Sequence, residues 1–156
     1  MSNHKTKVNE LTSHWVLLSV FLGMLLITNL ACHIVGSEIQ VDMDEEQRIF
    51  IRTIFYIIAL ILFPLANLVR HILLRLNQTM PGSNPAKNRY FMTIAVTLTM
   101  VEIVGFFGLM MFIFGDGYNT LYIFSALALL GIFLHRPKKP EYLQIIDAIE
   151  SKQPHN

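Results

Sequence analysis

The sequence predicts an all-α integral membrane protein, with four transmembrane helices packed as a small bundle and a short C-terminal amphipathic helix. Of the 156 residues, 53% are hydrophobic and 15% are charged, and the mean hydropathy of +0.49 is too high for an ordinary soluble domain. The apolar residues collect into four blocks separated by short polar segments. A helix needs about 20 apolar residues to cross the hydrocarbon core of a bilayer, which is about 30 Å thick. Each block is therefore expected to form one span, and little chain remains for a soluble domain.

The first predicted span covers residues 15–35 and follows a polar tail, residues 1–14, that carries Lys5 and Lys7. Trp15 is a suitable interfacial anchor at its start. A basic start before an apolar run is also typical of a cleavable signal. The run is long for a signal, however, and the segment before Cys32 has Asn29 where a lipidation motif needs an aliphatic residue. We therefore expect this segment to be retained as a helix.

The second predicted span covers residues 49–69 and continues as a helix to about Leu76. Pro64 lies inside it, removes one backbone donor and leaves the Leu60 carbonyl free, which predicts a kink. A polar loop, residues 36–47, joins the first two spans and contains five acids: Glu38, Asp42, Asp44, Glu45 and Glu46. Oxygen ligands of this kind can hold a hard cation, but the glycine-centred calcium-loop pattern is missing. A solvated acidic loop with no metal is the favoured interpretation.

The third and fourth predicted spans cover residues 90–114 and 118–135 and are joined by the tight link Gly115-Asp116-Gly117. Pro81-Gly82 and Asn84-Pro85 provide turn chemistry before the third span. The tail, residues 136–156, predicts a short helix over 140–152 whose apolar residues share one face: Tyr142, Ile145, Ile146 and Ile149. This helix either docks a partner or lies on the membrane surface, and the surface position is favoured.

The basic residues near the span ends predict the orientation. They concentrate in the N-terminal tail, the loop between spans two and three, and the C-terminal tail: Lys5, Lys7, Arg70, Arg75, Lys87, Arg89, Arg136, Lys138, Lys139 and Lys152. Arg48 and Arg52, beside the acidic loop, are the exceptions. We therefore expect a multi-pass protein of the bacterial inner (plasma) membrane with both termini in the cytoplasm.

Glu102 is the one ionisable side chain between Tyr90 and Phe114, and it falls in the middle of the third span. A carboxylate at the bilayer centre costs on the order of 3 kcal/mol, so it is expected to face a partner or a cavity. Thr99, Gly105 and Gly108 lie near it on the helix and are expected to pack against a neighbouring helix, which the glycines allow to approach closely. Glu102 either exchanges a proton or cation, or serves as a neutral packing group. The sequence weighs these two hypotheses about equally, and no second acid or base lies near the middle of a span to form a relay.

The run from Glu102 to Leu109, EIVGFFGL, resembles the ion-binding helix of the rotary ATPase c-type proteolipids, in which an acid precedes a glycine-leucine segment. The resemblance covers about Thr97 to Pro137. The four-span length and the Arg136-Pro137 ending are also similar to small uncharacterised bacterial membrane proteins that share this stretch. The resemblance implies that Glu102 is the ion-carrying carboxyl. In four-span vacuolar-type proteolipids the essential acid lies in the last helix, whereas here it lies in the third.

Other polar residues suggest weaker sites. Asn29 and Asn67 are expected to bridge helices, at about 0.6 kcal/mol each. His71 and His135 fall at cytoplasmic span ends, where facing histidines can ligate a haem iron, although interfacial histidines are the favoured interpretation for these and for His14 and His33. No arrangement of Ser, His and Asp, phosphate loop or thiol pair is present, and Cys32 is the single cysteine. We therefore expect no enzyme activity and no cofactor.

These observations predict a small accessory subunit of an inner-membrane complex that handles protons or cations through the mid-membrane carboxyl of Glu102. A proteolipid-like ion-translocating oligomer is the alternative, and a haem-binding membrane anchor is a further one. The expected partners are the lipid bilayer and either another membrane protein or further copies of the chain. The net charge of +1, without a long basic run, gives no indication of nucleic-acid binding.

Overall fold

The computed structural model describes residues 11–79 and 84–151, and this part of the chain is helical with no strand. Its elements in order are α2 (Thr12–Val35), the 3-10 turn η1 (Gly36–Ile39), α3 (Glu45–Thr79), α4 (Ala86–Ile113), α5 (Tyr118–Leu134) and α6 (Lys139–Glu150). The all-α prediction is confirmed for these residues. Helix α3 passes through Pro64 without ending and is longer at both ends than the predicted span.

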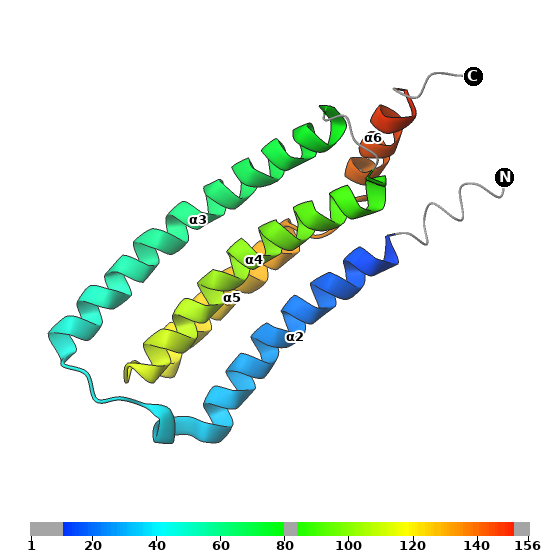
Figure 1. Ribbon diagram of the computed structural model, residues 1–156. Coiled ribbons are helices and arrows are strands. Elements are labelled where there is room, and N and C mark those ends of the chain that lie inside the picture. Colours follow the sequence, from blue (N-terminus) through cyan, green and yellow to red (C-terminus); the bar gives the residue numbers. More distant parts are fainter. Residues whose placement is uncertain (1–10, 80–83, 152–156) are drawn as a thin grey trace.

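Helices α2, α3, α4 and α5 run side by side as an elongated bundle, with α6 at one end (Figure 1). Helix α4 is central, because it contacts α2, α3 and α5. Twelve of its residues are buried, compared with three in α2 and three in α3. The outer faces of α2 and α3 expose large apolar side chains such as Leu26, Ile27 and Leu60. Such faces suit contact with lipid.

Three helices, α2, α3 and α4, are long and apolar enough to cross a membrane. Helix α5 has 17 residues and is long enough to cross a membrane only if it is counted together with α6, from which it is bent by 44°. The described residues therefore contain three spans, or up to four if this bent pair forms one span. At 1.5 Å per residue, α5 is about 26 Å long, slightly shorter than the hydrocarbon core. The helical, membrane-type composition is therefore confirmed, and the exact number of spans stays a prediction.

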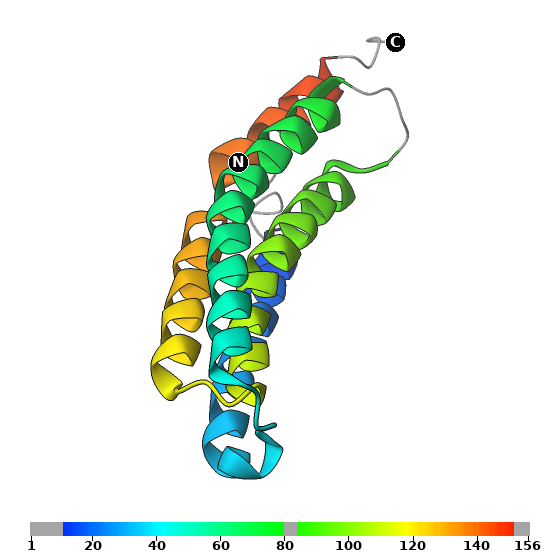
Figure 2. The ribbon, with the colours of Figure 1, turned by 90° about the vertical axis from the view of Figure 1, so that its left-hand side faces the viewer.

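The acidic loop folds against the turn between α4 and α5 at one end of the bundle (Figure 2). The Val41 N–H donates to the Ile113 carbonyl at 2.7 Å, and Arg52 pairs with the buried Asp116 at 3.2 Å. Gly115 has φ +81°, and a Cβ there would lie 3.2 Å from the Val41 carbonyl oxygen. The turn therefore favours glycine both for its backbone conformation and for this close contact.

Helix α6 packs against α3 and α4 at the opposite end. Its apolar residues Tyr142, Ile145 and Ile146 are buried in one cluster with Tyr90 and Ile94 of α4. The preference for a helix resting on the membrane surface was therefore wrong, because the bundle itself covers this apolar face. The predicted last residue of that helix, Lys152, lies outside the described residues.

Candidate functional site

Glu102 lies near the middle of α4 and is only 4% exposed. Its Oε2 atom is buried and has no hydrogen-bond partner among the described residues. The expectation that this acid is enclosed rather than facing lipid agrees with its burial. A packing group would be expected to bond both carboxyl oxygens, since an unsatisfied buried acceptor costs about 1–3 kcal/mol. The site therefore presents a carboxyl oxygen with free bonding capacity inside the bundle.

The two glycines that follow Glu102 lie where α4 meets its neighbours. A Cβ on Gly105 would lie 2.9 Å from Leu25 Cδ1 of α2 and 3.4 Å from Ala128 Cβ of α5. A Cβ on Gly108 would lie 3.0 Å from Phe124 Cβ and 3.1 Å from the Leu121 carbonyl oxygen. These are close helix approaches of the kind that small residues permit in membranes. They hold α2 and α5 against the part of α4 that carries the acid.

The threonines of α4 hydrogen-bond to their own helix rather than to Glu102. Thr97 is buried and its hydroxyl donates to the Thr93 carbonyl at 2.9 Å. Thr99 donates to the Ala95 carbonyl at 2.9 Å and is exposed on the outside of the bundle. The expectation that Thr99 packs between helices was therefore wrong. The rotation of the helix about its axis turns this position outward.

The two asparagines differ in their surroundings. Asn29 bridges α2 and α5, because its Nδ2 donates to Ser125 Oγ at 2.9 Å and Ser125 Oγ donates to its Oδ1 at 3.1 Å. Asn67 is exposed and makes no hydrogen bond within the described ranges, so it does not bridge helices as expected. Asn67 and Pro64 instead line a hollow on the side of α3.

A second buried polar cluster joins α3, α4 and α6. Arg70 is 4% exposed and donates to the His135 carbonyl at 2.7 Å, the Arg136 carbonyl at 3.1 Å and Glu141 Oε2 at 2.6 Å. The Tyr90 hydroxyl also donates to Glu141 Oε2, at 3.0 Å. In the sequence, Arg70 is evident only as a basic residue that flanks a span. Its partner lies 71 positions away, and no local signal links the two.

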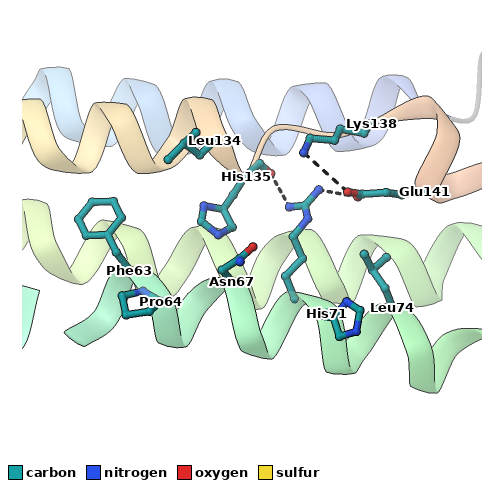
Figure 3. Close-up of a pocket in the computed structure, with 10 residues that line it drawn as sticks. Phe63, Pro64, Asn67, His71, Leu74, Leu134, His135, Lys138 and Glu141 are labelled. Carbon is teal, nitrogen blue, oxygen red and sulfur yellow. Dashed lines mark hydrogen bonds and ion pairs between the residues drawn. The ribbon is translucent and has the colours of Figure 1, made fainter. Parts of the chain in front are cut away.

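The hollow beside this cluster has a volume of about 510 Å³ and opens between α3 and the α5–α6 junction (Figure 3). Its lining comprises Phe63, Pro64, Asn67, Arg70, His71, Leu74, Leu134, His135, Lys138 and Glu141. Nδ1 of His135 lies 2.9 Å from the Gly131 carbonyl oxygen. A carbonyl only accepts, so Nδ1 carries the ring proton and Nε2 is left as an acceptor in the neutral ring.

The histidines considered for haem ligation are distributed over different surroundings. His71 and His135 line the same hollow, whereas His14 is buried with its ring 5.0 Å from that of Tyr90. His33 lies at the other end of the bundle and stacks on Tyr118 at 4.8 Å. No group of three or more metal-ligating side chains occurs in residues 11–79 and 84–151.

The described residues form an all-helical protein with three to four helices apolar enough to cross a membrane and with the enclosed carboxyl of Glu102. Comparisons of the chain with protein-family models, with curated proteins and with solved structures gave no match. The resemblance to proteolipids therefore stays a prediction, based on about Thr97 to Pro137 and on the motif from Glu102 to Leu109.

Proposed function

We propose that the chain is a four-span protein of the bacterial inner membrane with both termini in the cytoplasm. The basic residues near the span ends support this orientation. The helix ends also agree with it, because the start of α2, the end of α3 and the C-terminal helix α6 lie together at one end of the bundle (Figure 1). The acidic loop and Asp116 lie at the other end.

This placement is tested by cysteine labelling in intact cells whose outer membrane is permeabilised. In a Cys32→Ser background, Asp42→Cys is expected to react with a membrane-impermeant maleimide, and Glu150→Cys only after the inner membrane is opened. Both positions are exposed. Reaction at both sites without lysis, or the reverse pattern, would refute the proposed orientation.

Within this placement, we infer that the protein acts as an accessory subunit whose Glu102 takes up and releases a proton or cation. The single observation that carries the inference is the buried Oε2 without a bonding partner in the described part of the chain. A midplane carboxyl is costly, and its burial here is not offset by a hydrogen bond at this oxygen. A partner subunit or a second copy of the chain would complete the ion path, since the spans contain no second acid near Glu102.

Carbodiimide labelling tests this inference, because a carbodiimide adds covalently to a protonated carboxyl in an apolar site. Peptide mapping of the labelled protein is expected to place the adduct on Glu102. The adduct yield is expected to fall at high pH if a proton is exchanged, or in the presence of sodium if sodium is exchanged. Glu102→Gln removes the reacting group while preserving its shape, and Thr99→Val is the matched control on the same helix. An adduct yield at Glu102 that is independent of pH and of sodium would overturn ion exchange.

A second experiment measures activity, with the protein and the partners that copurify with it in mild detergent. Glu102→Gln is expected to leave assembly unchanged and to abolish proton-dependent activity of the complex in liposomes. If assembly and activity both survive, ion exchange by Glu102 is excluded. If assembly itself is lost, Glu102 acts as a packing group.

A further inference from the structure

The hollow between α3 and the α5–α6 junction contains polar groups that the bundle does not use. The Asn67 amide, the His71 ring and the Nε2 atom of His135 make no hydrogen bond within the described residues. His135 is only 4% exposed, and its ring points into the hollow (Figure 3). The buried Nε of Arg70 also has no partner in this part of the chain. A buried polar atom calls for a hydrogen-bond partner, so the His135 ring and the Arg70 Nε indicate a site for a polar ligand, and the exposed Asn67 and His71 are available at its edge.

The charges around the hollow leave an excess of positive charge. Arg70 and Glu141 pair at 2.6 Å, so their charges cancel. Lys138 lies 4.0 Å from the other carboxylate oxygen of Glu141 and its side chain is 49% exposed. Its ammonium group therefore carries the net charge at the mouth of the hollow. An anionic group is the complementary ligand.

The remaining walls of the hollow are apolar. Phe63, Pro64 and Leu134 line the end of the hollow away from Lys138 and Glu141, and Leu74 lies beside His71 (Figure 3). A ligand that fits both parts has a charged end and an apolar end. In the placement proposed above, this end of the bundle lies at the cytoplasmic leaflet, which carries the anionic lipids.

We propose that this hollow binds an anionic phospholipid whose headgroup carries free hydroxyls, as phosphatidylglycerol does. Lys138 pairs with the phosphate, and the Asn67 amide and the His71 ring donate to its oxygens. His135 Nε2 accepts a hydrogen bond from a headgroup hydroxyl, because its Nδ1 already holds the ring proton against Gly131. The apolar wall takes the beginning of an acyl chain. The proposal rests on the membrane placement above and not on the role of Glu102.

The test is native mass spectrometry of the full-length protein released from mild detergent after incubation with phosphatidylglycerol. A phosphatidylcholine with the same acyl chains is the comparison lipid. The wild-type protein is expected to retain phosphatidylglycerol selectively, and Lys138→Gln is expected to weaken retention about fivefold, as for one basic residue near an anionic lipid surface. Lys139→Gln is the matched control, since this neighbouring lysine does not line the hollow. Asn67→Ala and His71→Ala, both at exposed positions, are also expected to weaken retention.

Three results would overturn the proposal. Equal retention by Lys138→Gln and Lys139→Gln would show only general attraction to a basic surface. Equal retention of the two lipids would show that headgroup charge is not recognised. Competition by glycerol 1-phosphate as effective as that by the lipid would assign the site to a soluble phosphate ester instead. Maleimide labelling of the orientation and carbodiimide labelling of Glu102 are separate readouts, so failure of lipid binding is distinguishable from failure of the membrane placement and from failure of ion exchange.

Discussion

Replacing Glu102 by methionine is expected to make the protein more stable. The side chain is 4% exposed, and its Oε2 atom lacks a hydrogen-bond partner in the described structure. A buried acceptor left unsatisfied costs about 1–3 kcal/mol. Methionine has a similar length, one heavy atom fewer and a flexible apolar chain that adapts to irregular space. The free energy of unfolding is therefore expected to rise by about 1–3 kcal/mol, which is the cost removed.

The assay is unfolding in mixed detergent micelles, followed by far-UV circular dichroism as the fraction of denaturing detergent increases. Thr99→Val serves as the control, because Thr99 is on the same helix but exposed, and such surface changes usually stay within about 0.5 kcal/mol. A loss of stability in Glu102→Met, with Glu102→Gln close to wild type, would refute the reasoning. That pattern would mean that the side chain contributes a hydrogen bond the bundle needs.

Contacts elsewhere in the bundle predict further outcomes in the same unfolding assay. Gly108→Ala is expected to cost about 1–3 kcal/mol through overpacking, since the new Cβ would lie 3.1 Å from a backbone oxygen; Gly23→Ala, with open space around it, is the control and should not destabilise. Arg70→Gln is expected to cost about 3–5 kcal/mol because it leaves the Glu141 carboxylate without its buried cation, with only the more distant, exposed Lys138 nearby. Limited proteolysis should then cut α6 faster, and replacing both Arg70 and Glu141 by apolar residues should recover much of the loss. Asn29→Ala is expected to cost about 0.6 kcal/mol, the average for a hydrogen bond between membrane helices, and a larger loss in a Ser125→Ala background would contradict a direct bridge between the two side chains.

The positions of the long helices could be predicted from the sequence because hydropathy alone determines which segments avoid water. The burial of Glu102 was predictable for the same reason, since a charged group in an apolar span has to be enclosed. The side of α4 that faces the bundle was not predictable. This helix is apolar on all sides, so nothing in its sequence distinguishes the buried Thr97 from the exposed Thr99.

The Arg70 cluster could not be predicted because it depends on where α6 folds. The pattern of Tyr142, Ile145 and Ile146 identified an apolar face, but a membrane surface and a bundle end satisfy such a face equally well by burial alone. In the structure, the ion pair between Arg70 and Glu141, at 2.6 Å, favours the position of α6 at the end of the bundle. Electrostatic partners far apart in the sequence become evident only when the helices are assembled.

Arg70 and Glu102, two of the buried ionisable side chains in the described part of the chain, differ in a way that bears on function. Arg70 donates to two backbone carbonyls and to a carboxylate, and only its Nε lacks a partner among the described residues. The contacts that fix α6 to α3 therefore account for most of its buried polar atoms. Glu102 has an oxygen without a partner in the described chain, so the contacts that surround it do not explain its burial. Stability favours an apolar residue at this position. If Glu102→Met is more stable and also inactive, the acid is required for what it binds and not for how the helices pack.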